Sequence, residues 1–436
     1  MNDGFGRTKD GFERADDGFG RTKDGFGIGV VGCGFIARER HLPSVEYLPG
    51  VHVAGLQNRT RETAETVAET CRERGWGDPT VTDSVAGLVA DPAVDGLWVT
   101  SPNFTRVDVV DAAVDAVADG ATLRGIAMEK PVARNLREAE RIRDRIESAG
   151  IPHAYLENWP HEPDISGLRE LLWARGREAG RPYLARSQAE HGGPHSAWFW
   201  DGERQGGGAL TDMLCHALAG NHVLLSDPGR DGRGDGSNGS KDADAGLAPV
   251  SVTADTETLK WARESYAAEL REEHGVDYGT NPADDYARAT VKYEDADGNP
   301  VVSEATGSWC YVGAGVRRSI ELLGPEYSGQ VVADESASSV FLSDAVGDGE
   351  GWAEKQNATS GRTPIAAADV VTGGFVAENR DAVASFRAGE NGALDLTDGY
   401  RVLRTCMAAY KSAEEGREVV LADTDLTGYT PPPARR

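Results

Sequence analysis

The chain has 436 residues, which is long enough for two domains with separate hydrophobic cores. Asp and Glu number 71 against 45 Lys and Arg, and only eight of these basic residues are lysine. The resulting charge of −26 disfavours nucleic acid or an anionic membrane as a partner, and no run of about 18 apolar residues predicts a membrane span. An acidic, lysine-poor surface favours adaptation to a salt-rich cytoplasm, with an ordinary acidic enzyme as the alternative. No secretory signal is visible, so we expect a cytoplasmic protein.

Residues 1–26 contain a near-duplicate, because Asp3–Phe12 is repeated at Asp17–Phe26. This segment is rich in Gly, Asp and Lys and has neither helical nor strand periodicity. It predicts a disordered leader.

Between residues 27 and 158, short apolar runs alternate with amphipathic stretches, which predicts a Rossmann domain with a doubly wound parallel sheet. The expected strands are Ile28–Val31, Val53–Leu56, Leu97–Thr100, Ile126–Met128 and Ile151–Leu156. The expected helices are Glu62–Arg74, Val107–Ala118 and Leu136–Ser148. Asn135 is the expected N-cap of the last helix, and Gly150 its C-cap.

Residues 159–425 predict a second, α+β domain with an open, mostly antiparallel sheet, followed by a tail at 426–436. The expected strands are Tyr183–Ala189, Val250–Leu259, Tyr286–Glu294, Val301–Trp309 and Arg317–Leu323. The expected helices are Ile165–Ala174, Leu210–Leu225 and Tyr400–Gly416. Asp297-Gly298 predicts a hairpin turn, and the Gly-, Asp- and Ser-rich stretch 227–248 a surface insertion. An open sheet face favours a homo-oligomer, either a dimer or a tetramer.

A glycine turn follows the first expected strand. Gly32-x-Gly34-x-x-Ala37 lies between a strand and a helix, the context in which such glycines bind a dinucleotide. The first glycine permits the tight turn, the second admits the pyrophosphate, and the amides of the helix N-terminus hold the phosphates. A glycine turn without a ligand is the alternative.

The end of the second strand bears on which dinucleotide binds. The sequence there reads Leu56-Gln57-Asn58-Arg59-Thr60 and has no carboxylate for the adenine ribose. Arg59 could hold a 2′-phosphate, so NADP is favoured over NAD. The alternative is that Arg59 is a solvated loop residue and either cofactor binds.

Two further motifs carry side chains suited to acid–base chemistry. Glu129-Lys130-Pro131 closes the expected strand Ile126–Met128, where a lysine can bond a substrate hydroxyl. In Gly206–His216, Asp212 and His216 are spaced i, i+4 and share a helix face, while three glycines are expected to let the backbone approach a ligand. The alternatives are a surface ion pair for Lys130 and a buried structural role for His216.

The segment Glu190–Trp200 precedes the glycine run and combines imidazoles with indoles. His191, His195 and Trp198, together with Asn158, are candidate contacts to a sugar, because aromatic faces cover its CH patches. Tryptophans that wedge the two domains together are the alternative. A metal site built from the histidines at 191, 195 and 216 is disfavoured, because no carboxylate at ligand spacing accompanies them.

The cysteines are scattered without a CxxC pair, which predicts buried free thiols. They are Cys33, Cys71, Cys215, Cys310 and Cys406.

With these motifs the chain resembles the glucose–fructose oxidoreductase / inositol dehydrogenase / rhizopine catabolism (Gfo/Idh/MocA) family over roughly residues 27–425. The resemblance rests on VGCGFIA, on Ser101-Pro102-Asn103, on EKP and on GGGALTDMLCH. It implies a Rossmann domain joined to an open antiparallel sheet, with Lys130, Asp212 and His216 as the substrate-facing triad. The expected cofactor contacts are Gly32, Gly34, Phe35, Ile36, Asn58, Arg59, Ser101, Asn103, Glu129 and Lys130. The chain departs from many relatives in having Arg106 where they carry a histidine, and in the 227–248 insertion.

The sequence therefore predicts an NAD(P)-dependent oxidoreductase that transfers a hydride between nicotinamide and a carbinol carbon of a sugar, cyclitol or related polyol. One alternative is an NAD-dependent glycosidase of the same fold that uses transient oxidation. Another is a nucleotide-responsive regulatory protein without enzymatic activity.

Overall fold

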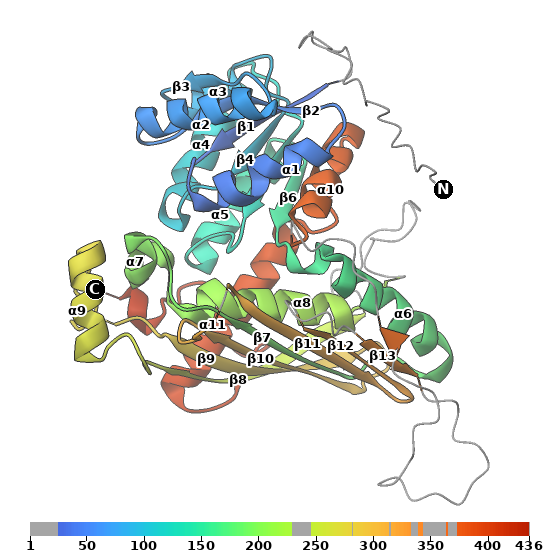
Figure 1. Ribbon diagram of the computed structural model, residues 1–436. Coiled ribbons are helices and arrows are strands. Elements are labelled where there is room, and N and C mark those ends of the chain that lie inside the picture. Colours follow the sequence, from blue (N-terminus) through green and yellow to red (C-terminus); the bar gives the residue numbers. More distant parts are fainter. Residues whose placement is uncertain are drawn as a thin grey trace, which may run out of the picture.

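The computed structural model describes residues 25–228, 246–280, 282–313, 315–332, 339–342, 363–364 and 373–435, which form two lobes (Figure 1). Most of the expected leader and most of the expected insertion at 227–248 lie outside these ranges. Three of their residues are already strand: Phe26 begins β1 (Phe26–Val31), and Leu247 and Ala248 begin β8 (Leu247–Glu257).

The first lobe is built on a six-stranded, all-parallel sheet with the order β3-β2-β1-β4-β5-β6. The strands after β1 are β2 (Val51–Gln57), β3 (Thr80–Thr82), β4 (Gly96–Val99), β5 (Gly125–Glu129) and β6 (His153–Leu156). The five expected strands are confirmed. The sequence missed β3, because Thr-Val-Thr gives no apolar run. The order reverses between β1 and β4, so ligands are expected at the carboxyl ends of these strands.

Helices cover both faces of this sheet (Figure 1). They are the π-helix η1 (Ala37–His41), α1 (Leu42–Ser44), η2 (Val45–Tyr47), α2 (Arg61–Arg74), α3 (Val85–Val89), η3 (Asn103–Thr105), α4 (Arg106–Ala118) and α5 (Leu136–Ser148). Asn135 caps α5 as expected, since its side chain accepts from the Glu138 N–H. The C-cap, however, is Ala149; Gly150 follows it with φ +67°, a left-handed conformation that glycine adopts easily.

The second lobe contains a nine-stranded sheet in the described residues, with the order β14-β13-β12-β11-β7-β10-β9-β8-β15. Besides β8, its strands are β7 (Leu184–Glu190), β9 (Tyr286–Asp295), β10 (Pro300–Ser308), β11 (Arg317–Gly324), β12 (Tyr327–Val332), β13 (Ser339–Leu342), β14 (Thr363–Pro364) and β15 (Val419–Val420). Neighbours are antiparallel except β7 and β10, which run parallel. The expected hairpin joins β9 to β10, with Gly298 at φ +80°.

The helices α6 (Pro163–Ala179), α8 (Cys215–Leu225) and α11 (Leu396–Glu415) lie between this sheet and the first lobe, while its opposite face is uncovered in Figure 1. Shorter helices are η4 (Trp159–His161), η5 (Ala197–Trp200), α7 (Gly202–Gln205), the π-helix η6 (Leu210–Leu214), α9 (Glu264–His274) and η8 (Pro432–Ala434). Nowhere in the described ranges is a helix both long enough and apolar enough to cross a membrane.

One helix of the C-terminal half returns to the first lobe. The sequence did not predict α10 (Phe375–Ala388), which lies beside β6 (Figure 1). Phe386 packs over Gly125, where a Cβ would collide with its ring, and edge-on against Trp98 with ring centroids 5.9 Å apart. The core of the first lobe is therefore completed by residues outside the expected 27–158 range.

Candidate active site

Lys130 is placed between the lobes by the end of β5, directly before a cis peptide bond to Pro131. Its ammonium Nζ lies 3.1 Å from Asp212 Oδ1 and donates to the Asp212 carbonyl oxygen at 3.0 Å. Only 16% of the lysine side chain is exposed. Two residues that were expected to act together thus form a mostly buried ion pair, with one partner from each lobe.

Asp212 is the most heavily bonded carboxylate of the site. Its Oδ2 also accepts from His191 Nε2 at 3.4 Å and from Trp309 Nε1 at 3.0 Å. Burial favours the neutral acid, but Lys130 and His191 together hold the pKa of Asp212 well below its usual range. Burial likewise disfavours the ammonium, yet Asp212, with Cys215, Glu129 and Glu157, raises the pKa of Lys130 above its ordinary value. The pair therefore stays ionised at neutral pH.

The glycine run before Asp212 fits against the protein itself. A Cβ at Gly208 would collide with the Asp284 backbone, and one at Gly206 with Arg134, so the expected approach of a ligand to these glycines is wrong. Asp284 accepts from Leu210 N–H at 2.8 Å, and Tyr410 O–H donates to its other oxygen at 2.7 Å. These contacts fix the start of η6.

The helix that carries Asp212 and His216 changes type between them. Residues Leu210–Leu214 form the π-helix η6, and α8 begins at Cys215. π-Helical turns are rare and are frequently found at functional sites. A spacing of four residues is close to one turn in either geometry, so both side chains still point to one side.

His216 is held by a carboxylate that the sequence did not identify. Its Nδ1 lies 2.6 Å from Oε1 of Glu157, a fully buried residue directly after β6. The Trp159 backbone N–H donates to the same oxygen at 3.3 Å, and the Trp159 ring stacks on the imidazole at 5.6 Å. Nδ1 therefore donates to Glu157, which leaves Nε2 for a substrate. A carboxylate directly after an expected strand was the signal that could have found it.

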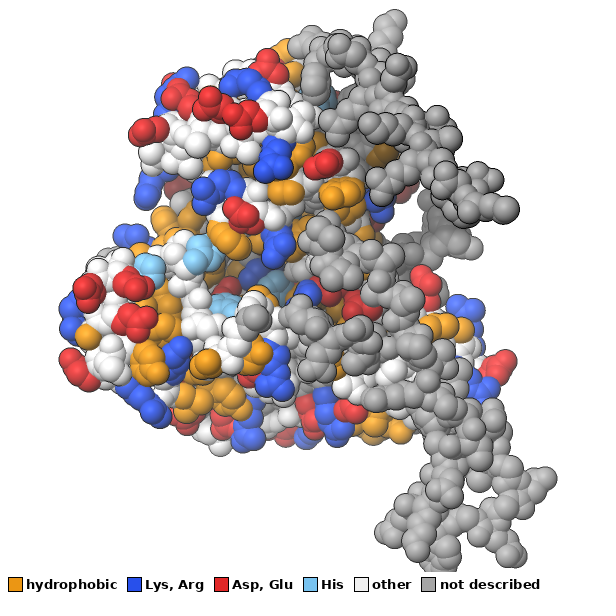
Figure 2. All heavy atoms as spheres, in the orientation of Figure 1, with side chains coloured by type: hydrophobic (Ala, Val, Ile, Leu, Met, Phe, Trp, Pro, Cys, Tyr) orange, Lys and Arg blue, Asp and Glu red, His pale blue; other side chains and the backbone are white. Residues whose placement is uncertain are grey.

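The four expected sugar contacts go to different places. His191 is hydrogen-bonded to Asp212 through Nε2, and its Nδ1 accepts from Gly193 N–H at 3.0 Å. His195 contacts Phe35 across the gap between the lobes, with ring centroids 4.5 Å apart. Figure 2 shows histidine, Lys and Arg side chains gathered where the two lobes meet. His216, His191 and His195 each have a separate partner within the protein, namely Glu157, Asp212 and Phe35.

Trp198 and Asn158 both make contacts within the protein. The Trp198 ring stacks on Phe199, with centroids 3.8 Å apart, and lies edge-on to Phe104 of the first lobe at 6.3 Å. This fits the alternative in which the tryptophan packs between the two domains. The Asn158 amide donates to the Gly373 carbonyl at 2.7 Å, just before α10. Their roles as sugar contacts stay predictions.

The glycine turn after β1 fits a dinucleotide. Gly32 has φ +97°, and a Cβ there would lie 2.7 Å from the Ser101 backbone, whereas nothing lies within 4 Å of one at Gly34. One side of the turn is thus packed and the other is open for phosphate. Asn58 Oδ1 accepts from Cys33 N–H at 3.1 Å, which ties the turn to the end of β2. Phe35 is 43% exposed, and Arg59 is exposed beside this turn.

Burial raises the pKa of every cysteine thiol above its ordinary value, so the thiols are poor nucleophiles at neutral pH. All five cysteines are free; Cys310 is only half-buried and the other four are buried. Burial raises the pKa of the Cys33 thiol to about 12, so this residue is a small neutral side chain within the turn.

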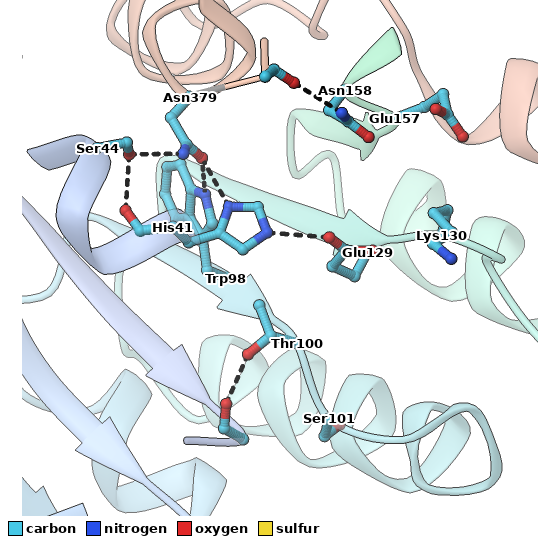
Figure 3. A network of polar contacts seen from close by, with 12 residues as sticks. His41, Ser44, Trp98, Thr100, Ser101, Glu129, Lys130, Glu157, Asn158 and Asn379 are labelled. Carbon is cyan, nitrogen blue, oxygen red and sulfur yellow. Dashed lines mark hydrogen bonds and ion pairs between the residues drawn. The ribbon is translucent and has the colours of Figure 1, made fainter. Parts of the chain in front are cut away.

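Several expected cofactor residues bond to the protein with their side chains. Ser101 Oγ accepts from Thr105 at 2.8 Å, and Asn103 Nδ2 donates to the Gln205 carbonyl at 2.7 Å. The Glu129 carboxylate points to His41, 3.0 Å away (Figure 3). These placements leave Gly34, Phe35, Ile36 and Arg59 as the more open parts of the expected cofactor surface.

Arg106, the departure noted above, braces the strand that carries Lys130. This buried guanidinium donates to the carbonyl oxygens of Glu129 and Pro131, and to that of Ser101 at 3.1 Å. Burial lowers its pKa to about 10, although Glu129 and Tyr155 oppose the shift, so it stays a cation at neutral pH.

Relatives were found by sequence. Residues 26–154 match the family described as "Oxidoreductase family, NAD-binding Rossmann fold". The chain is 27% identical to a 1,5-anhydro-D-fructose reductase of Ensifer adhaerens over 62% of this chain and 80% of the relative. It is 26% identical to D-xylose 1-dehydrogenase (NADP(+)) 2 of Haloferax volcanii over 46% of this chain and 58% of that one. An uncharacterized Saccharomyces cerevisiae protein is 32% identical over 33% of this chain, but only 39% of its own length is matched.

Solved structures share the fold over almost the whole chain. Levoglucosan dehydrogenase in complex with NADH and levoglucosan has a TM-score of 0.68 at 18% identity and covers 91% of this chain and 99% of its own. GenD2 from gentamicin A biosynthesis, in complex with NAD, has a TM-score of 0.66 at 22% identity over 91% and 96%. The expected fold class is confirmed, and residues 26–154 match an NAD-binding Rossmann oxidoreductase model, in agreement with the resemblance noted in the sequence.

Proposed function

We propose that the chain is an NAD(P)-dependent oxidoreductase that transfers a hydride between nicotinamide and a carbinol carbon of a sugar, cyclitol or related polyol. The observation that carries the proposal is the pairing of Lys130 with Asp212 on the same helical segment as His216, whose ring is already oriented by Glu157. An ammonium and an imidazole that both reach the reacting hydroxyl would let the alcohol lose its proton as hydride leaves its carbon.

Lys130 polarises the reacting oxygen. An ammonium has three N–H donors, and two of them go to Asp212. The third is available to the substrate oxygen. Because Asp212 keeps Lys130 charged, the lysine stabilises developing negative charge on that oxygen and does not act as the base.

His216 takes the proton in the oxidising direction. Glu157 accepts the N–H at Nδ1, which leaves a lone pair on Nε2 for the hydroxyl hydrogen. The imidazolium formed on proton transfer is stabilised by Glu157. When bound, the nicotinamide supplies the hydride acceptor, and the open surface at Gly34 and Phe35 is where this chain would hold the dinucleotide.

Cofactor choice rests on Arg59. It is exposed at the end of β2, whereas nearby Arg61 is bonded to Glu65 and Asp83 at 2.8 and 2.6 Å. We therefore favour NADP, with Arg59 as the ligand of the 2′-phosphate. The name of the Haloferax volcanii relative specifies NADP, while the two solved structures above contain NADH or NAD, so NAD is the alternative.

We also propose that the uncovered face of the second sheet joins two copies of the chain. This face carries opposite charges side by side: Arg186 bonds Glu304 and Glu321, and Arg288 bonds Asp255. Light scattering after gel filtration should report a dimer or tetramer; a monomer at micromolar concentration would contradict this assignment.

The function is tested by offering sugars and cyclitols with NAD and NADP in parallel, at molar and at low salt. We expect steady formation of reduced nicotinamide with at least one free sugar or cyclitol. Glycoside cleavage with no net cofactor reduction would instead establish the glycosidase alternative. Cofactor binding without turnover of any compound would favour a regulatory protein.

A further inference from the structure

A closed chain of hydrogen bonds lies behind Glu129 and joins both halves of the sequence (Figure 3). Trp98 Nε1 donates to Asn379 Oδ1 at 2.7 Å, and Asn379 Nδ2 donates to Ser44 Oγ at 2.7 Å. Ser44 Oγ in turn donates to the His41 carbonyl oxygen at 2.6 Å. All four residues are buried, so their donors and acceptors must satisfy one another.

This chain fixes the direction of the Asn379 amide. An indole N–H can only donate, so the atom that faces Trp98 must be the Asn379 oxygen. The same oxygen lies 3.2 Å from His41 Nδ1. His41 Nδ1 therefore carries a hydrogen and donates it to Asn379.

The other ring nitrogen of His41 faces a carboxyl group. Nε2 lies 3.0 Å from Glu129 Oε1. A lone pair on Nε2 opposite a carboxylate oxygen would leave two buried acceptors facing each other without a hydrogen. A hydrogen must therefore lie between them, in addition to the one on Nδ1. The His41–Glu129 pair thus holds one proton more than a neutral imidazole beside a carboxylate.

We propose that His41 is an imidazolium, kept so by Asn379, and that this pair is a positioning device for Lys130. This inference rests on the proposed function only for the role of Lys130; the ionisation of His41 stands on the hydrogen bonds alone. The proposal adds Asn379 of α10, which lies outside every sequence motif, to the residues that position Lys130.

The surrounding charges agree with a proton on His41 and not on Glu129. Burial alone would raise the pKa of Glu129, but the hydrogen bond and charge of His41, with Lys130 and Arg106, lower it below its ordinary value. Glu378 on α10 makes no hydrogen bond in the described residues, and burial, with Glu129 and Glu157 nearby, raises its pKa well above the usual range. A neutral Glu378 therefore does not compete with Glu129 for the imidazolium. The edge-on ring of Phe375, at 5.2 Å, completes the surroundings of His41.

The pair acts on Lys130 through the neighbouring residue. His41 holds the Glu129 side chain, while Arg106 holds the carbonyl groups on either side of Lys130. A Glu129 carboxylate tied to His41 is not free to swing toward the ammonium, which bonds Asp212 instead. The Glu129 side chain and the main chain on either side of Lys130 are thus held by different partners. The Lys130 side chain therefore stays directed toward Asp212.

The ionisation is tested by ¹H–¹⁵N spectra of the full chain labelled with ¹⁵N-histidine, with His41→Gln to assign the His41 signals. At neutral pH, we expect both His41 nitrogens to be protonated, with similar ¹⁵N shifts. Widely separated shifts, the sign of a neutral ring, would overturn the proposal. This readout needs no substrate, so it can succeed or fail whatever the chain oxidises.

The role of Asn379 is tested by a matched pair of variants. Asn379→Asp keeps an acceptor for Nδ1–H and should keep the imidazolium. Asn379→Leu removes the acceptor, so His41 should become neutral with its hydrogen on Nε2. If the leucine variant does not fold, as a thermal melt would show, Asn379→Ala replaces it. An imidazolium that persists without the acceptor would overturn the role of Asn379.

Positioning is tested by kinetics on the same proteins, with whichever sugar the wild type oxidises. We expect kcat to fall about tenfold in Asn379→Leu, because small misplacements near a reacting centre are costly, while the KM for cofactor stays near wild type. Asn379→Asp should recover most of that loss. Wild-type kcat in a leucine variant whose His41 is neutral would show that the pair does not position Lys130.

Discussion

The two lobes contribute to the site in different ways. The cofactor side of the first lobe relies on backbone shape: Gly32 packs on Ser101, and Asn58 receives the Cys33 N–H. The side facing the substrate relies on buried charges that pair across the lobes, as Lys130 does with Asp212. Changes on the cofactor side should therefore alter affinity, whereas changes on the substrate side should alter rate.

Replacing His216 with alanine should produce the largest effect. Removal of a general acid–base group typically lowers turnover by about 10²–10⁴-fold. Because His216 lies on α8 and not on the glycine turn, the dissociation constant for NAD(P) should stay within about twofold of wild type, by the separation of binding from chemistry. Turnover and fluorescence titration with cofactor measure the two quantities. An unchanged kcat would remove His216 from the mechanism.

Asp284→Asn should show how much the buried Asp284 carboxyl, which bonds the start of η6, contributes to stability. Burial raises the pKa of Asp284 to about 6, so the folded chain binds this proton more tightly than the unfolded chain, in which the pKa is about 4. The stability from this group is fully present below pH 4 and is lost as the pH rises through 6. Between pH 7 and pH 4, the free energy of unfolding of the wild type should therefore rise by about 3 kcal/mol relative to that of the variant. Urea unfolding of both proteins across this range measures it, and parallel curves would refute the assignment.

Glu157→Gln should slow turnover without removing the imidazole. The glutamine carbonyl can still accept from Nδ1–H, but it lacks the charge that stabilises the imidazolium. Loss of a charged hydrogen-bond partner predicts a fall of about 10–100-fold in kcat. A variant as fast as wild type would limit Glu157 to a packing role.

Arg59→Ala should have the smallest effect, confined to the cofactor side. We expect the affinity for NADP to fall about tenfold while that for NAD and the kcat stay unchanged. Arg61→Ala is the matched control, because Arg61 is already bonded to Glu65 and Asp83. An equal loss for both cofactors, or for both variants, would contradict a specific 2′-phosphate contact.

The sequence predicted the parts of the site that depend on local patterns, but not those that depend on contacts between distant residues. The glycine turn, the EKP lysine and the Asp212–His216 spacing are local patterns, and their elements formed where expected. Glu157, Trp309 and Asn379 reach the site only through tertiary folding, since their partners lie 59, 97 and 338 residues away along the chain.

Local chemistry also misled one interpretation. A glycine run shows that something approaches the backbone, but not what it is; here the approaching groups are Asp284, Tyr410 and Arg134. The helix α10 was missed because nothing in its local pattern shows that it returns to the first lobe, where Phe386 completes the core over Gly125.

The most direct test of the account is a double-mutant cycle on Lys130→Met and His216→Ala, read as the rate of cofactor reduction in a single turnover. If both side chains act on one alcohol in one step, the double variant should be no slower than the slower single variant, because groups that act as a unit give strongly non-additive losses. Losses that multiply fully would mean that the ammonium and the imidazole work independently, and would contradict a shared site between the lobes.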